Sequence, residues 1–69
     1  MYNPKYLHIE SGEIIDALSY KKDTFMEIRE YLLSVGEIEP TESIPSDEEF
    51  IEAGIEELDG DWEYRKITP

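Results

Sequence analysis

The sequence contains no cysteine, so neither a disulfide nor a thiolate metal site can stabilise this chain. It has a single histidine, His8, and a lone histidine in a chain without cysteine has no nucleophile–base pair to join. No apolar run approaches the ~18 residues that a membrane span needs, and the first residues lack the long apolar core of a signal peptide. We therefore expect a soluble, cytoplasmic protein.

Motifs of enzymes and of cofactor sites are also missing. The sequence has no G-x-S-x-G, no phosphate-binding loop and no Gly-rich dinucleotide turn. Asp59, Asp61 and Glu63 have a spacing that suits hard cations, but the frame of an EF-hand loop is absent. A chain this short also leaves little room for the apolar pocket in which a carboxylate becomes a general acid. We predict that the protein is not an enzyme and has no cofactor and no dedicated metal site.

Basic residues are scarce and unevenly placed. The chain has six Lys and Arg against eighteen Asp and Glu, for a formal net charge of −12. Residues 1–29 are nearly neutral, with five acids and four bases, whereas residues 30–64 contain thirteen acids and no base. Phosphate groups and anionic lipids attract Lys and Arg, so this charge argues against direct binding to nucleic acid or to membranes.

What the chain does have is patterned apolar sequence. Hydrophobic residues make up 39% of the chain and aromatic residues 12%, and their regular spacing separates it from disordered acidic chains. Sixty-nine residues allow a single domain, residues 1–69, which buries only about 60% of the surface that its unfolded form exposes. Residues 36–46 contain two prolines and are too short for a domain linker, so we interpret them as a connecting loop.

Residues 5–18 have the pattern of a β-hairpin. Ser11-Gly12 places a glycine at a tight turn between β-branched and aromatic residues. Ile9 and Ile14 are then expected to face each other across the two strands. The alternative is a helix that starts at Ser11, because the apolar residues that follow also fit helical spacing.

Residues 23–36 are predicted to form the core helix. Thr24 and Glu27 have the spacing of a capping box, and Gly36 is placed to end the helix. Between them, four apolar residues recur on one stripe, as in a helix that buries one face: Phe25, Ile28, Leu32 and Val35.

A second capping box opens the acidic part of the chain. Ser46 and Glu49 have the required spacing, and Asp47, Glu48 and Glu49 lie in a first turn where the helix dipole favours negative charge. Part of the acidity therefore has a structural explanation. Gly54, with an apolar residue after it, is expected to end this short helix.

Residues 55–67 are predicted to form a second hairpin that turns at Asp59-Gly60. The resulting fold is α+β in the order β-hairpin, long helix, short helix, β-hairpin (ββααββ). The alternative is one helix over residues 47–58 with Gly60 as its cap, because the apolar residues there keep helical spacing. That alternative makes the C-terminal half mostly helical.

Nine carboxylates and no base crowd into residues 47–63. Self-repulsion of this order works against the compact state, so we expect the charge to have a use. A basic protein surface is complementary to such a face, and strongly basic grooves are typical of proteins that hold DNA or RNA. We predict a partner-binding surface made of ten acidic and aromatic residues: Glu48, Glu49, Glu52, Glu56, Glu57, Asp59, Asp61, Trp62, Glu63 and Tyr64.

Trp62 and Tyr64 are included because aromatic side chains of these types are preferred interface anchors. The alternative for both is packing in the core.

The leading functional hypothesis is a small binding protein that occludes the nucleic-acid groove of a basic partner. Phage- and plasmid-encoded inhibitors of restriction, CRISPR or host replication and transcription proteins act in this general way. A toxin-neutralising protein of the immunity or antitoxin type is a second hypothesis, because acidity also suits binding to a basic nuclease. A third is an accessory domain whose acidity serves only solubility. The sequence leaves the oligomeric state open.

Overall fold

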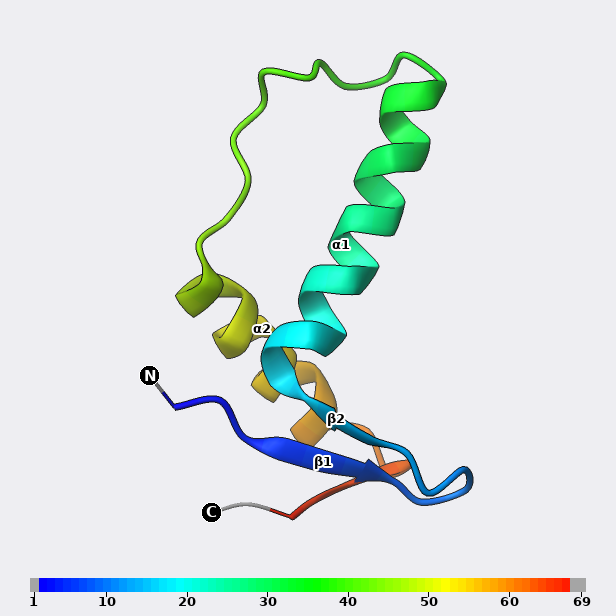
Figure 1. The fold of residues 1–69 in the computed structure, drawn as a ribbon, viewed down its shortest axis with the longest axis vertical. Coiled ribbons are helices and arrows are strands. Elements are labelled where there is room, and N and C mark those ends of the chain that lie inside the picture. Colours follow the sequence, from blue (N-terminus) through cyan, green and yellow to red (C-terminus); the bar gives the residue numbers. More distant parts are fainter. Residues whose placement is uncertain (1, 68–69) are drawn as a thin grey trace.

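Three short strands form an antiparallel sheet, and two helices lie on one side of it (Figure 1). The computed structural model describes residues 2–67. The elements are β1 (Lys5–His8), β2 (Ile14–Asp16), α1 (Ala17–Ser34), α2 (Asp47–Asp59) and β3 (Tyr64–Lys66). The order across the sheet is β2-β1-β3. The predicted α+β class is confirmed, with the element order ββααβ.

β1 and β2 form the hairpin that the N-terminal sequence predicts. The predicted register is wrong, because Leu7 and not Ile9 lies opposite Ile14. The turn is longer than the tightest hairpin turns: the N–H of Gly12, at a φ of 77°, donates to the carbonyl of His8 at 2.8 Å. The strand therefore stops at His8, and Ile9 lies in the turn, where it is exposed. The alternative helix at this position is not formed.

α1 begins at Ala17, earlier than the predicted start at Asp23. Asp16 is its N-cap, and its carboxylate accepts a hydrogen bond from the N–H of Ser19 at 2.8 Å. The hairpin leads into the helix without a connecting loop, since Asp16 is both the last residue of β2 and the N-cap of α1.

The predicted capping box of Thr24 and Glu27 is wrong, because both residues lie inside α1. The Thr24 hydroxyl donates to the carbonyl of Tyr20 at 2.9 Å, as hydroxyls in helix interiors commonly do. The same T-x-x-E spacing thus occurs where the chain is already helical, and it marks no helix start here.

The end of α1 follows the prediction. Gly36 has a φ of 77°, and its N–H donates to the carbonyl of Leu33 at 3.2 Å. The N–H of Glu37 donates to the carbonyl of Leu32 at 3.0 Å. These two bonds form a Schellman ending after the cap residue Val35.

α2 is one continuous helix, so the predicted second hairpin over residues 55–67 is wrong and the helical alternative is correct. The capping box of Ser46 and Glu49 is present as predicted. The helix continues past Gly54 because Leu58, one turn later, is buried against the core. Gly60 is the C-cap, as the alternative requires.

The last strand pairs with the first strand and not with its neighbour in sequence. β3 lies antiparallel to β1, which makes β1 the centre of the sheet. The facing residues are Tyr6 and Lys66, Leu7 and Arg65, and His8 and Tyr64.

The core lies where β1, the start of α1 and α2 meet. Residues 23–36 were predicted to form the core helix, but Ile28 is 54% exposed and Val35 is 51% exposed. The part of α1 that enters the core is its first turn, from Ala17, which lies before the predicted range. Figure 1 shows the second half of α1 rising away from the sheet. The buried hydrophobic residues are Tyr6, Ala17, Phe50, Ile51 and Leu58.

Gly54 lies in the middle of α2, where this helix passes against the first residue of α1. A methyl group on Gly54 would lie 3.0 Å from the carbonyl carbon of Ala17 and 3.2 Å from its Cα, and closer still to its carbonyl oxygen. These are backbone atoms of a fully buried residue, so they cannot turn aside as a flexible side chain can. Gly54 therefore permits the crossing of the two helices, and the prediction that it ends the helix is wrong.

Gly54→Ala is expected to lower the free energy of unfolding by about 1–3 kcal/mol, because overpacking against Ala17 outweighs the gain of about 1 kcal/mol that alanine brings to a helix interior. Urea unfolding followed by circular dichroism measures the difference. The control is Ala53→Gly at the neighbouring, half-exposed position, which is expected to lose about 1 kcal/mol from helix propensity alone. A Gly54→Ala protein more stable than the parent would contradict the close crossing.

The cap at Asp16 should make part of the stability depend on pH. Its pKa is lowered, chiefly because the carboxylate accepts the N–H of Ser19, while partial burial opposes this. A pKa lowered by folding adds stability above the unfolded value of about 3.9 and loses it as the pH falls through the folded value.

Asp16→Asn caps a helix about as well but does not titrate. The stability difference between the parent and this variant is therefore expected to be constant near neutral pH and to shift in favour of the variant below about pH 4. Urea unfolding at several pH values tests this, and parallel curves down to acid pH would contradict it.

Candidate functional site

α2 presents a row of carboxylates on the side opposite the core. Phe50, Ile51, Gly54 and Leu58 face inward, which turns the positions between them outward. On the outward side, exposed glutamates recur at every fourth position of the helix. Their carboxylates are therefore spaced about 6 Å apart along the helix axis. This glutamate row consists of Glu48, Glu52 and Glu56.

The glutamate row is available to a partner. Within residues 2–67, none of its three side chains makes a hydrogen bond or an ion pair. Two of them, Glu48 and Glu52, border a shallow hollow whose apolar lining comes from Tyr2, Ile51 and Ile55. A hollow lined by both apolar and acidic side chains suits a long basic side chain, whose stem is apolar and whose head is charged.

Several of the other predicted carboxylates are engaged within the fold. The Nζ of Lys21 lies 2.8 Å from Glu57, and Glu49 accepts the N–H of Ser46 at 3.2 Å in the capping box. Asp61 accepts the N–H of Glu63 at 3.0 Å. These groups contribute to the negative field, but they also hold local structure, so they are less suited to rearrange around a partner.

Asp59 is the most clearly structural of the predicted site residues. Its carboxylate accepts the hydroxyl of Tyr6 at 2.7 Å, and the Tyr6 side chain is almost fully buried. The pKa of Tyr6 is raised, first by burial and then by this hydrogen bond and by the charge of Asp59. Asp59 therefore satisfies the one polar atom that Tyr6 brings into the core.

The two predicted aromatic anchors lie in different environments. Trp62 is 85% exposed, so the alternative that it packs in the core is wrong. Tyr64 is half-buried, with its ring 4.9 Å from that of His8 and 5.8 Å from that of Tyr20, as core packing requires. Only Trp62 presents its ring to solvent.

The backbone around Trp62 is held in place. The N–H of Tyr64 donates to the carbonyl of Asp61 at 3.1 Å, and the N–H of Ile9 donates to the carbonyl of Glu63 at 3.0 Å. The exposed indole thus projects from a fixed turn, which lowers the entropy lost when a partner covers it.

Several residues at this surface were not predicted from the sequence. Ile9 and Glu10 line a shallow hollow with Trp62 and Glu63, and they arrive there through the pairing of β1 with β3. Tyr2 reaches the glutamate row from the N-terminal segment. No local sequence pattern predicts that these residues reach the surface described here, because both arrangements depend on contacts between distant parts of the chain.

The described residues hold no group of three or more His, Asp or Glu side chains placed to share a metal ion. Over the same range, neither helix has both the length and the apolar character that crossing a membrane requires. Comparison of the chain with protein-family models, with curated proteins and with solved structures finds no match.

The hydrogen bond between Tyr6 and Asp59 predicts an asymmetric pair of substitutions. Asp59→Ala leaves a buried hydroxyl without an acceptor and is expected to cost about 1–3 kcal/mol, whereas Tyr6→Phe leaves an exposed carboxylate in water and is expected to cost about 0.5–1.5 kcal/mol. In the Tyr6→Phe background, Asp59→Ala should then cost almost nothing. Urea unfolding of the four proteins gives the cycle, and equal costs of Asp59→Ala in both backgrounds would show that the bond contributes nothing.

Proposed function

We propose that this chain is a non-enzymatic binding protein that docks its glutamate row on a basic surface of a partner protein, at the groove where that partner holds nucleic acid. The observation that carries the proposal is the row itself: three exposed carboxylates at regular spacing on one helix, none of them paired within the described residues.

A rigid helix supports this use of charge. The capping box fixes the start of α2, and burial of Leu58 fixes its end, so the carboxylates need little ordering when a partner binds. Lys and Arg in a nucleic-acid groove are arranged to meet closely spaced phosphates. A row of carboxylates about 6 Å apart offers the same sign of charge at comparable intervals.

Trp62 gives a second reason to favour a binding surface over a solubility device. Solubility is served by charge alone, and an indole that is 85% exposed works against it. Tryptophan is among the residues most enriched at the centres of protein interfaces. An exposed indole on a pinned turn is therefore better explained by a partner than by solubility.

The decisive experiment uses a variant that removes only unpaired charge. Glu48→Gln, Glu52→Gln and Glu56→Gln together neutralise the row and leave the bonds of Glu49, Glu57 and Asp59 intact. The control removes three exposed acids elsewhere: Glu27→Gln, Glu37→Gln and Glu39→Gln. Both variants have the same net charge, so a difference between them reports position and not total charge.

Each protein is used as bait in a bacterial lysate treated with nuclease, and captured proteins are identified and their affinities measured with purified components. We expect one nucleic-acid-binding protein, displaced by added DNA or RNA, with an affinity that falls as salt rises. The row variant should lose on the order of tenfold in affinity, or about 1.4 kcal/mol, and the control far less.

The other outcomes separate the competing hypotheses. A single cognate partner that nucleic acid does not displace would indicate a toxin-neutralising protein in place of groove occlusion. Equal binding by the two variants, or no specific partner at all, would overturn the proposal and leave the acidity as a solubility feature.

A further inference from the structure

The outer half of α1 carries more apolar surface than the domain covers. Tyr31 is 64% exposed and Met26 is 41% exposed, in addition to the exposed Ile28 and Val35. The apolar residues from Phe25 to Val35 spread over roughly 200° of the helix circumference, about twice the width that a helix needs to pack against one neighbour. Part of the surface of this helix is therefore without a partner within residues 2–67.

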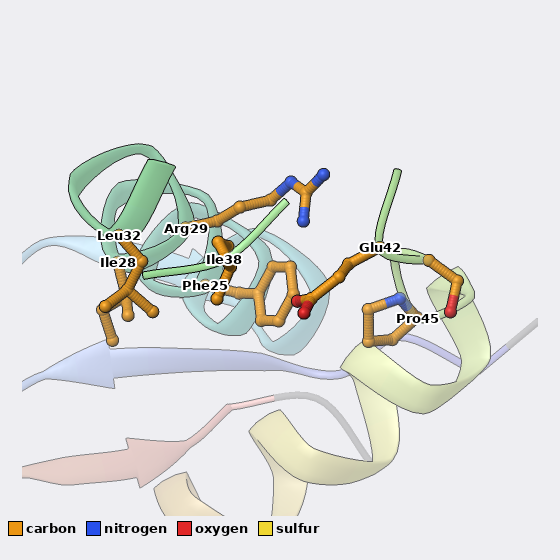
Figure 2. Close-up of a pocket in the computed structure, with 8 residues that line it drawn as sticks. Phe25, Ile28, Arg29, Leu32, Ile38, Glu42 and Pro45 are labelled. Atoms are coloured by element: carbon orange, nitrogen blue, oxygen red, sulfur yellow. The ribbon is translucent and has the colours of Figure 1, made fainter. Parts of the chain in front are cut away.

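The side toward the loop is the covered one. Figure 2 shows Phe25 and Arg29 extending toward the segment that carries Glu42 and Pro45. The Phe25 ring lies edge-on to that of Phe50 at 5.3 Å, and the Arg29 guanidinium donates to the carbonyl of Pro40 at 3.1 Å. These contacts leave two flanks of α1 to solvent, one that carries Met26 and another that carries Ile28, Tyr31 and Val35. Ile28 also borders the hollow between α1 and the loop.

The flank that carries Ile28, Tyr31 and Val35 has the spacing of a helix-pairing seam. Its residues alternate at intervals of four and three, which places successive side chains on the line where two helices meet. All four are exposed and uncharged, in a chain whose net charge is −12. This α1 seam consists of Thr24, Ile28, Tyr31 and Val35.

Two measures of shape show that the single chain is less compact than a typical monomer of its size. The accessible surface is 5080 Å², against about 4,500 Å² expected for a folded monomer of this size, an excess of several hundred Å². The radius of gyration is 13.6 Å, against about 11 Å for a compact domain of this length. A standard interface buries about 800 Å² on each partner, which is of the same order as this excess.

Charge decides which arrangement of two copies is possible. α2 packs beside the N-terminal end of α1, through Gly54 and Ala17, so the glutamate row lies toward that end. Parallel pairing of two α1 helices would bring the two acidic faces together. Antiparallel pairing sends them to opposite ends, and the uncharged seam is where two copies repel each other least.

We propose that two copies of this chain form a dimer through the α1 seam, with the two helices antiparallel about a twofold axis between Arg29 and Glu30. Ile28 of one copy then packs against Tyr31 of the other, and Thr24 lies opposite Val35. The dimer covers this flank of α1 and enlarges a small core, in which five hydrophobic residues are buried among residues 2–67. It does not depend on the glutamate row, and screening by salt should strengthen it.

Sedimentation equilibrium of the full chain over a wide concentration range, at low and at moderate salt, tests the dimer. Ile28→Glu places a charge at the seam twice per dimer and is expected to weaken association by at least about tenfold. The control is Thr41→Glu, which adds the same charge at an exposed loop position. Circular dichroism confirms that both variants are folded, which is expected because Ile28 is exposed in the single chain.

Cross-linking tests the orientation, and the cysteine-free sequence makes it direct. Thr24→Cys copies mixed with Val35→Cys copies should form a mixed disulfide under mild oxidation, while Thr24→Cys copies alone should not link. A monomer at all concentrations and both salt levels, or a dimer that Ile28→Glu does not weaken, would overturn the proposal. Efficient self-linking of Thr24→Cys would overturn the antiparallel arrangement.

Discussion

The close passage of α2 over the first residue of α1 is the contact on which the remaining packing depends. Gly54 brings the backbone of one helix against the backbone of the other at Ala17. The same end of α1 is fastened to the N-terminal segment, because the N–H of Ala17 donates to the carbonyl of Pro4 and the N–H of Leu18 donates to the side chain of Asn3. Both helices are thereby fixed against the sheet at one point. The orientation of α2, and with it the direction in which its carboxylates face, follows from this crossing.

The carboxylates of this chain differ in what they do, although the sequence presents them as one acidic run. Asp16 and Glu49 cap helices, Asp59 satisfies a buried hydroxyl, and Glu57 pairs with Lys21. When the carboxylates with structural roles are set aside, a smaller set of acidic side chains remains, and the fold does not explain their charge. The proposed binding rests on this remainder and not on the total net charge.

Local signals in the sequence were sufficient for some elements. The hairpin, the capping box at Ser46 and the glycine ending at Gly36 each depend on residues close together in the chain, and each was predicted. The start of α1 was missed because Thr24 and Glu27 imitate a cap inside a helix. The hairpin predicted for residues 55–67 was wrong, since the choice between it and the helical alternative depends on whether Leu58 is buried in a core.

The parts of the candidate site that escaped prediction are those created by distant contacts. The pairing of β1 with β3 brings Ile9 and Glu10 beside Trp62. No local sequence pattern predicts the pairing of two strands so far apart in the chain. The role of Gly54 was misread for the same reason, because a glycine that ends a helix and a glycine that admits a neighbour look alike in sequence. The row of glutamates on α2 was within the predicted set, but its separation from the structurally engaged acids required the hydrogen bonds and ion pairs.

The exposed position of Trp62 has a practical consequence for optical work on this protein. It is the single tryptophan of the chain, and its indole is already largely in water in the folded state. Its emission therefore changes little when the chain unfolds, and the five tyrosines or the far-ultraviolet dichroism are better reporters of folding. For the same reason, a change in the emission of this indole reports that a partner covers the turn between α2 and β3 and not that the chain has unfolded. The tryptophan fluorescence thus reports on the surface of the molecule and hardly on its core.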